Sequence, residues 1–159
     1  MKKMRLYLDT SVISHLDAPD TPEKMQETLA LWEDIRAGKY EIVLSDVVFE
    51  EIEKCEQPKK QRMYEYLAEI KYTETQNTKE IENIANHIIQ LNILQEKHYN
   101  YSSHIACAIV RECDFIVSWN FKHLVNPKTV KGVGYVVSIL RYKNIDIVSP
   151  PTLLNMEEL

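Results

Sequence analysis

The fold is decided by the stretch MKKMRLYLDTSVIS, residues 1–14, in which an apolar run is followed at once by the carboxylate of Asp9. Residues 4–8 are apolar enough to form a buried strand, and Thr10 and Ser11 follow the acid. Open α/β sheets bind their ligands in a crevice outside the carboxyl ends of the strands. The position of Asp9 therefore predicts a first parallel strand that delivers an acidic side chain to such a crevice.

Segments with strand and helix patterns alternate along the rest of the chain. Further strands are predicted at residues 40–45, 71–73, 114–119 and 145–149, the last one stopping at Pro150. The predicted helices cover residues 22–38, 46–52, 58–70, 79–91, 102–112 and 127–142. Strands separated by helices of this length indicate a parallel sheet with helices on both faces. We therefore expect one α/β domain over residues 1–159, with a three-layer α/β/α architecture around a central parallel sheet.

The composition agrees with an ordinary globular protein, because 45% of the residues are hydrophobic and 27% are charged. A length of 159 residues suits one domain with a sizeable core. No stretch approaches the roughly 20 apolar residues of a transmembrane helix. The apolar run before Asp9 is also too short for a signal peptide. These features predict a cytoplasmic protein without a membrane segment.

The cysteines, the histidines and the net charge limit the kinds of site that the chain can form. The three cysteines form no closely spaced pair, which indicates reduced thiols rather than a disulfide framework. The five histidines show no zinc-binding spacing. A net charge of −5 argues against a large basic face for nucleic acid. It does not argue against a nuclease, because a carboxylate cluster that holds Mg²⁺ is itself negative.

Polar side chains from separate segments can meet at the crevice beside Asp9. Glu50 and Glu51 lie on the helix predicted after the second strand, Tyr101 lies at the start of a later helix, and Asn120 follows the strand at residues 114–119. Carboxylate and amide oxygens are the ligands that Mg²⁺ and Mn²⁺ prefer. A metal ion held there can orient a phosphodiester and activate a water molecule.

Around these residues the sequence resembles the PIN-domain proteins, the fold of VapC-type toxins and related metal-dependent ribonucleases. The matching stretches are YLDTSVIS (7–14), LSDVVFEEIE (44–53), SSHIACAIVRECDFIVSWNFKHLVN (102–126) and IDIVSPPTLL (145–154). They follow the order of the family and together cover almost the whole chain. The resemblance implies a PIN-like fold and an endoribonuclease that hydrolyses RNA with Mg²⁺ or Mn²⁺. It also implies a small antitoxin protein as partner and a homodimer.

The resemblance assigns site residues one at a time. Asp9 matches the first acidic metal ligand, although an aspartate there can also cap the following helix. Glu51, directly before Ile52, matches the second acid, and Glu50 is the neighbour with which it can be confused. Ser11 resembles the small hydroxyl residue beside the first acid. It is expected either to support the metal's outer shell or to cap the helix.

Two positions depart from the family pattern. Relatives usually carry an aspartate three residues before the histidine of the HIA sequence, where this chain has Tyr101. A phenol with an ordinary pKa near ~10 is a poor Mg²⁺ ligand at neutral pH. Asn120 stands where many relatives have aspartate, and its amide oxygen can complete the metal shell without adding charge. The cluster would then carry two full negative charges, which predicts weaker metal binding and puts hydrolysis in question.

Other polar residues of these segments have structural explanations. Asp114 precedes its strand, so we expect it at the end of the sheet opposite Asn120, as a turn residue. His104 lies on an apolar helical run, which favours a packed and hydrogen-bonded histidine over a ligand. His98 and Asn100, beside the substituted position, are weak candidates for a compensating ligand.

Basic side chains offer two sets of candidates for contact with RNA. Lys122 and His123 come just after Asn120 and can contact phosphate, but a solvated loop explains them equally well. Lys59, Lys60 and Arg62 form a basic run, which more often is simply an exposed helix face.

Rival classes of enzyme fit the sequence less well. Haloacid-dehalogenase-like phosphatases need a second acid two residues after the first, where this chain has Ser11. Receiver domains need an acidic pair after the first strand and an acceptor aspartate after a middle strand, and neither is evident. The alternative to a ribonuclease is therefore a degenerate PIN-like domain that binds RNA or a protein without catalysis.

Overall fold

The structure, a computed structural model, describes residues 2–156 and contains a five-stranded sheet in which all neighbouring strands are parallel. The strands are β1 (Arg5–Leu8), β2 (Glu41–Ser45), β3 (Thr73–Thr75), β4 (Phe115–Val117) and β5 (Asp146–Val148). Their order across the sheet is β3-β2-β1-β4-β5. The predicted parallel sheet is confirmed.

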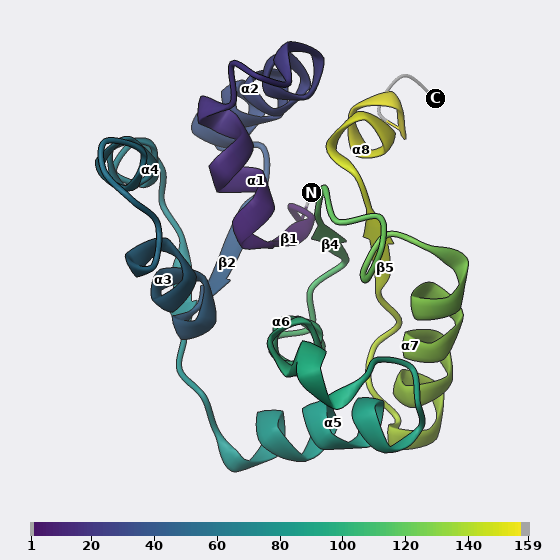
Figure 1. Ribbon diagram of the computed structural model, residues 1–159. Helices are drawn as coiled ribbons and strands as arrows, with labels where there is room; N and C mark the ends of the chain where they lie inside the picture. The colour runs from purple at the N-terminus through teal and green to yellow at the C-terminus, as the bar shows by residue number, and fades with distance from the viewer. Residues whose placement is uncertain (1, 157–159) are drawn as a thin grey trace.

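Helices cover both faces of the sheet, which gives the three-layer α/β/α architecture (Figure 1). One face carries α1 (Thr10–Ser14), α2 (Pro22–Arg36) and α8 (Pro150–Met156), and the other carries α5 (Lys79–Gln90), α6 (Tyr99–Val110) and α7 (Pro127–Leu140). The helices α3 (Asp46–Glu53) and α4 (Lys59–Leu67) follow β2, and short 3-10 turns precede α2 and α6. Among the helices of the described part, none is both long and apolar enough to cross a membrane.

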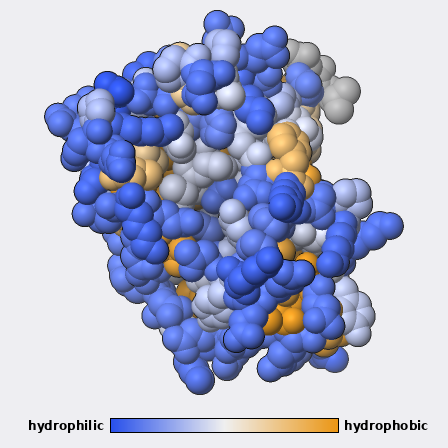
Figure 2. Space-filling model, in the orientation of Figure 1, coloured by the Kyte–Doolittle hydropathy of each residue, from blue (hydrophilic) through white to orange (hydrophobic). Residues whose placement is uncertain are grey.

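The apolar run that ends at Asp9 forms the centre of the core. Leu6, Tyr7 and Leu8 are completely buried in β1, between β2 and β4. The α6 segment at residues 102–109 is also buried on every side, and five of its eight residues are apolar. The face seen in Figure 2 is mostly hydrophilic, with apolar patches scattered over it. The apolar side chains therefore form the core on both faces of the sheet around β1.

The strand order places the crevice beside β1. The chain proceeds from β1 to β2 and β3 on one side, and then returns to add β4 and β5 on the other. Parallel sheets open a ligand crevice at such a switch point, outside the carboxyl ends of the strands. Asp9 follows β1 at this edge, and Ser118 follows β4. The fold therefore brings the predicted polar residues to the expected end of the sheet.

Some element boundaries differ from the sequence predictions. The third strand is two residues later than predicted, and α6 begins at Tyr99, which puts Tyr101 in its first turn. The prolines that end β5 also open α8, a helix that was not predicted. Proline is well suited to the first position of a helix, where no N–H is required. Thr78 caps α5 by accepting a 3.2 Å hydrogen bond from the Ile81 N–H.

Two glycines in α7 provide a matched test of this packing. A Cβ atom at Gly132 would lie 2.6–2.9 Å from side-chain carbons of Ile93, whereas a Cβ at Gly134 would meet nothing within 4 Å. Overpacking costs about 1–3 kcal/mol, and an alanine in open helix gains about 1 kcal/mol over glycine. We expect Gly132→Ala to lower the free energy of unfolding and Gly134→Ala to raise it, as measured by urea denaturation. Equal stabilisation by both substitutions would contradict the close contact with Ile93.

Candidate functional site

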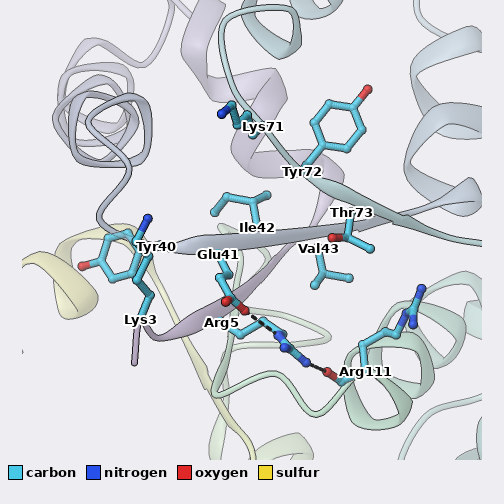
Figure 3. A pocket seen from close by; sticks show the side chains of 10 residues that line it. All are labelled: Lys3, Arg5, Tyr40, Glu41, Ile42, Val43, Lys71, Tyr72, Thr73 and Arg111. Carbon is cyan, nitrogen blue, oxygen red and sulfur yellow. Dashed lines mark hydrogen bonds and ion pairs between the residues drawn. The ribbon is translucent and has the colours of Figure 1, made fainter. Parts of the chain in front are cut away.

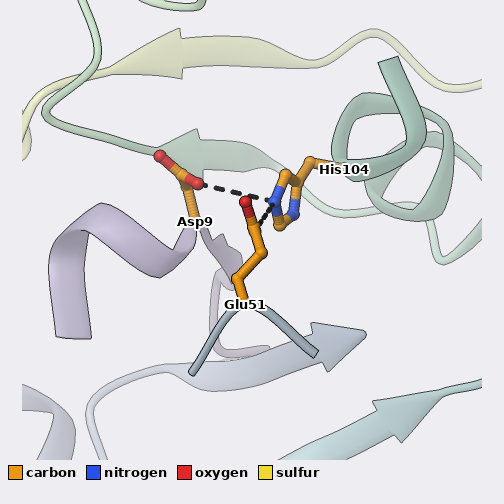
Figure 4. Close-up of side chains that lie close together, drawn as sticks. All are labelled: Asp9, Glu51 and His104. Atoms are coloured by element: carbon orange, nitrogen blue, oxygen red, sulfur yellow. Dashed lines mark hydrogen bonds and ion pairs between the residues drawn. The ribbon is translucent and has the colours of Figure 1, made fainter. Parts of the chain in front are cut away.

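Asp9, Glu51 and His104 come together from three separate elements (Figure 4). One potential ligand atom of each lies within 4.8 Å of those of the other two. Asp9 lies between β1 and α1, Glu51 on α3 after β2, and His104 on α6. Two carboxylates and an imidazole thus converge at the carboxyl ends of the strands.

The Asp9 carboxylate is buried, with 3% of the residue exposed, and is held by two hydroxyl groups. Its Oδ2 accepts hydrogen bonds from Ser118 Oγ at 2.6 Å and from Ser11 Oγ at 2.8 Å. Asp9 occupies the N-cap position of α1, yet its side chain makes no capping hydrogen bond. Ser11 Oγ in turn accepts the Trp119 N–H at 2.9 Å, so it ties α1 to the segment after β4. Asp9 is therefore oriented toward the crevice rather than used to start the helix.

The structure distinguishes the two neighbouring glutamates. Glu51 Oε1 accepts hydrogen bonds from Thr10 Oγ1 at 2.7 Å and from His104 Nε2 at 2.6 Å. Glu50 is exposed on the outside of α3. The two side chains diverge because successive residues of a helix point about 100° apart, and the buried Ile52 fixes which side of α3 faces the core. Glu51 is thus the acid beside Asp9.

His104 is completely buried and bonds at both ring nitrogens. The Nε2 atom of His104 bonds to Glu51 and lies 3.6 Å from Asp9 Oδ1. The Nδ1 atom lies 2.5 Å from the Tyr7 hydroxyl. That hydroxyl in turn lies 2.7 Å from Ser45 Oγ. Since a carboxylate only accepts, Nε2 carries the proton in the bond to Glu51. His104 is packed and hydrogen-bonded, as its sequence context predicts, but it also belongs to the acidic cluster.

The charges of the cluster stabilise one another. Burial by itself lowers the pKa of His104, but the hydrogen bond to Glu51 and the charges of Asp9, Glu51 and Asp46 raise it above the ordinary value. Burial raises the pKa of Glu51, but the hydrogen bond and charge of His104 and the bond from Thr10 outweigh this and lower it. The favoured state is a protonated His104 between two carboxylates. Burial also keeps the Tyr7 pKa well above its usual range, so Tyr7 stays a phenol.

Tyr101 and Asn120 lie next to this cluster and are hydrogen-bonded to each other. Burial and the charges of Asp9 and Glu51 raise the pKa of Tyr101. A hydrogen bond with the Asn120 side chain lowers this pKa, but the raising effects are larger. Asn120 Oδ1 accepts the His123 N–H at 2.8 Å, and the Asn120 N–H donates to Ser118 Oγ at 2.9 Å. Asn120 is therefore linked to Asp9 through Ser118.

The remaining candidates lie elsewhere. Asp114 accepts from the Arg5 N–H and pairs with Lys143 at the amino end of the sheet, as its position before β4 predicts. Cys55, Cys107 and Cys113 are free thiols. In α4, Lys60 lies 3.8 Å from Glu53 and Arg62 pairs with Asp17, so this basic run is mostly taken up by local ion pairs.

The donor set fits a divalent cation that prefers oxygen ligands. Asp9 Oδ1 and Glu51 Oε2 accept no hydrogen bond from residues 2–156, so each carboxylate keeps an oxygen for another ligand. Glu51 also leaves 27% of its side chain exposed, which opens the cluster to solvent. Because His104 partly neutralises the charge of the two acids, we predict that this site binds a divalent cation more weakly than a site of three or four carboxylates.

A polar cavity of about 500 Å³ lies at the opposite end of the sheet from the acidic cluster (Figure 3). It is surrounded by the starts of β1, β2 and β3, with Lys3, Lys71 and Arg111 on its walls. Arg5 pairs there with Glu41 and donates to the Arg111 carbonyl. No acid other than Glu41 lines this cavity, so among the described residues the metal-like cluster is confined to the carboxyl end.

Comparison with known proteins supports the fold. No family model matches the chain, and no curated protein matches it. Among the matching solved structures is the crystal structure of VapBC2 from Rickettsia felis bound to a DNA fragment from their promoter. The TM-score is 0.56 at 14% sequence identity, over 92% of this chain and 98% of that chain. At this identity the likeness shows the fold alone, and it agrees with a PIN-like α/β/α arrangement.

Proposed function

We propose that the protein is a PIN-type nuclease that hydrolyses RNA phosphodiesters with Mg²⁺ or Mn²⁺ held by Asp9 and Glu51, with Asn120 supporting the site. The observation that carries this proposal is the convergence of two carboxylates from β1 and α3 at the carboxyl edge of the sheet. Each has an oxygen outside the hydrogen bonds that orient it. Such oxygens are typical ligands of hard divalent cations.

The side chains around the carboxylates have separate tasks in this proposal. A bound divalent cation supplies an activated water and stabilises negative charge on a phosphodiester. Ser11 and Ser118 hold the Asp9 carboxylate in one orientation, and Thr10 does the same for Glu51. His104 holds a proton at Nε2 between the two acids and thereby limits their mutual repulsion. Asn120 positions Tyr101 at the wall of the site.

The proposal extends to a protein partner. The similar solved structure contains VapBC2 bound to promoter DNA. We infer that this chain likewise acts with a small antitoxin protein, as the toxin of a toxin–antitoxin pair, and that it forms a homodimer. Co-expression with a protein encoded by a small neighbouring gene, followed by copurification, tests the partner independently of catalysis.

RNA cleavage by the purified protein tests the proposed activity. We expect cleavage of single-stranded RNA in Mn²⁺ or Mg²⁺ and none in excess EDTA, because a divalent cation held by Asp9 and Glu51 would supply the activation of water. The readout is loss of a labelled full-length RNA on a denaturing gel, together with calorimetric titration of the metal. Cleavage that continues in EDTA, or a protein that binds no divalent cation, would refute the metal-dependent mechanism.

A second candidate function, an RNA- or protein-binding domain without catalysis, is favoured by one observation. Tyr101 stands beside Asp9 and Glu51 as a neutral phenol, where relatives of this fold carry an acid. We expect Tyr101→Asp to tighten divalent cation binding by about tenfold, the factor given by about 1.4 kcal/mol. Tyr101→Asn serves as the uncharged control. If the natural protein does not cleave RNA and Tyr101→Asp does, the binding-domain reading holds for the natural chain.

A further inference from the structure

Three aromatic rings, His98, Tyr101 and His123, pack together in a cluster beside the acidic cluster. The His98 and His123 rings lie 3.9 Å apart between centroids, and the Tyr101 ring lies 5.0 Å from His123 at an interplanar angle of 24°. His98 precedes α6, whereas His123 belongs to the segment after β4. The three rings therefore join two segments that are remote in sequence, and neither the metal site nor the core requires them to pack together.

Two rings of this cluster, His98 and His123, line a basic pocket of about 250 Å³. We call it the ring pocket, and define it by His98, His123, Lys97, Lys122 and Lys128 over a buried apolar base that includes Leu94. No acid lines it, and none of its three lysines takes part in an ion pair within residues 2–156. A positive pocket on a chain of net charge −5 points to an anionic ligand.

The histidine rings add a second kind of recognition. The His98 and His123 side chains line this pocket beside three lysines, so it offers aromatic rings as well as positive charge. Flat rings flanked by cations are how proteins bind single-stranded nucleic acids, since bases stack on the rings and cations bind the phosphates. An acidic peptide would use the lysines but not the rings.

A chain of side-chain contacts links the ring pocket to the candidate metal centre. Tyr101 stacks on His123 and bonds to Asn120, and Asn120 is linked through Ser118 to Asp9. The Asn120 side chain also accepts the His123 N–H, which fixes the backbone that carries the ring. Asn120 and Ser118 therefore join the His123 side of the pocket to the Asp9 carboxylate.

We propose that the ring pocket is a nucleotide subsite for single-stranded RNA, in which a base stacks on the His98–His123 pair and Lys97, Lys122 and Lys128 bind the flanking phosphate. This inference rests on the proposed function, because it takes the bound strand to be the substrate of Asp9 and Glu51. It adds a determinant of which RNA segment is presented to the carboxylates.

Binding without cleavage tests the subsite. The probe is a short fluorescein-labelled oligouridylate, and its affinity for the full chain is measured by anisotropy in EDTA. We expect His123→Ala to weaken binding between about fivefold and one hundredfold, the effect of losing one base stack, and His123→Phe to restore it. We expect Lys122→Ala to weaken binding and to reduce the slope of log Kd against log salt by about 0.7. Lys71→Ala, at the opposite end of the sheet, is the control and should bind like the unaltered protein.

The outcomes separate the subsite from catalysis. Weaker binding by His123→Ala in a protein that does not cleave RNA supports the subsite and refutes the nuclease. Cleavage by a protein in which neither His123→Ala nor Lys122→Ala changes affinity overturns the subsite alone. Displacement of the RNA by oligoglutamate at equal charge concentration would also overturn it, because simple charge would then explain binding.

Discussion

Replacing Asp9 with asparagine is expected to lower metal-dependent RNA cleavage by at least about a hundredfold. A metal ion contributes several kcal/mol of charge stabilisation, and each 1.36 kcal/mol is a tenfold change in rate. Asparagine removes the negative charge but keeps an oxygen that can accept the hydrogen bonds from Ser11 and Ser118. The buried pocket around residue 9 is therefore preserved while its capacity to hold a cation is reduced.

The measurement compares initial cleavage rates of Asp9→Asn and the unaltered protein over a range of Mn²⁺ concentrations. Glu50→Gln is the matched control, because it removes an exposed acid that makes no contact with the cluster. Circular dichroism verifies that both variants are folded. Unchanged cleavage by Asp9→Asn would place the active site elsewhere, and equal losses in both variants would point to overall charge instead of this site.

Local patterns predicted the parts of this site that depend on chain position. Asp9 directly follows an apolar strand, so its place at the carboxyl ends of the strands follows from its immediate neighbours. The strand at residues 71–73 was placed two residues early, because β3 pairs with β2 only from Thr73, where tertiary pairing rather than sequence sets the boundary. The helix after β5 was missed because two consecutive prolines stop a strand and start a helix equally well.

The parts that depend on side-chain packing were harder to predict. Glu50 and Glu51 are chemically identical neighbours, and only the packing of α3 decides which one faces Asp9. His104 lies in a helix segment that is buried on every side, where a histidine normally indicates core packing. Its contact with both carboxylates needs α6 to pass beneath β1 and β2, and that follows from the strand order. A histidine in a buried helix segment is the one sequence signal that pointed to it, because a buried polar side chain needs hydrogen-bond partners.

The second large effect concerns His104 and pH. Because the folded-state pKa of His104 is raised above the ordinary 6.5, its protonated form contributes stability that is fully present below pH 6.5 and is lost as pH rises through the folded value. Glu51 has the opposite sign: its lowered pKa contributes stability that is present above about 4.5 and is lost as pH falls through the folded value. The pair therefore stabilises metal-free protein most between pH 4.5 and 6.5.

His104→Gln tests this linkage, because glutamine keeps a hydrogen-bond donor but does not titrate. Breaking a buried charge pair costs about 3 kcal/mol when one partner remains, so the variant should be less stable at pH 6, and the difference should shrink toward pH 8. The measurement is urea unfolding in EDTA between pH 5 and pH 8, where the lowered pKa of His123 affects both proteins alike. The buried thiols of Cys107 and Cys113 do not ionise in this pH range, since burial raises their pKa to about 12. If the two proteins differ by the same free energy at every pH, His104 is a packed neutral histidine and not the cation between Asp9 and Glu51.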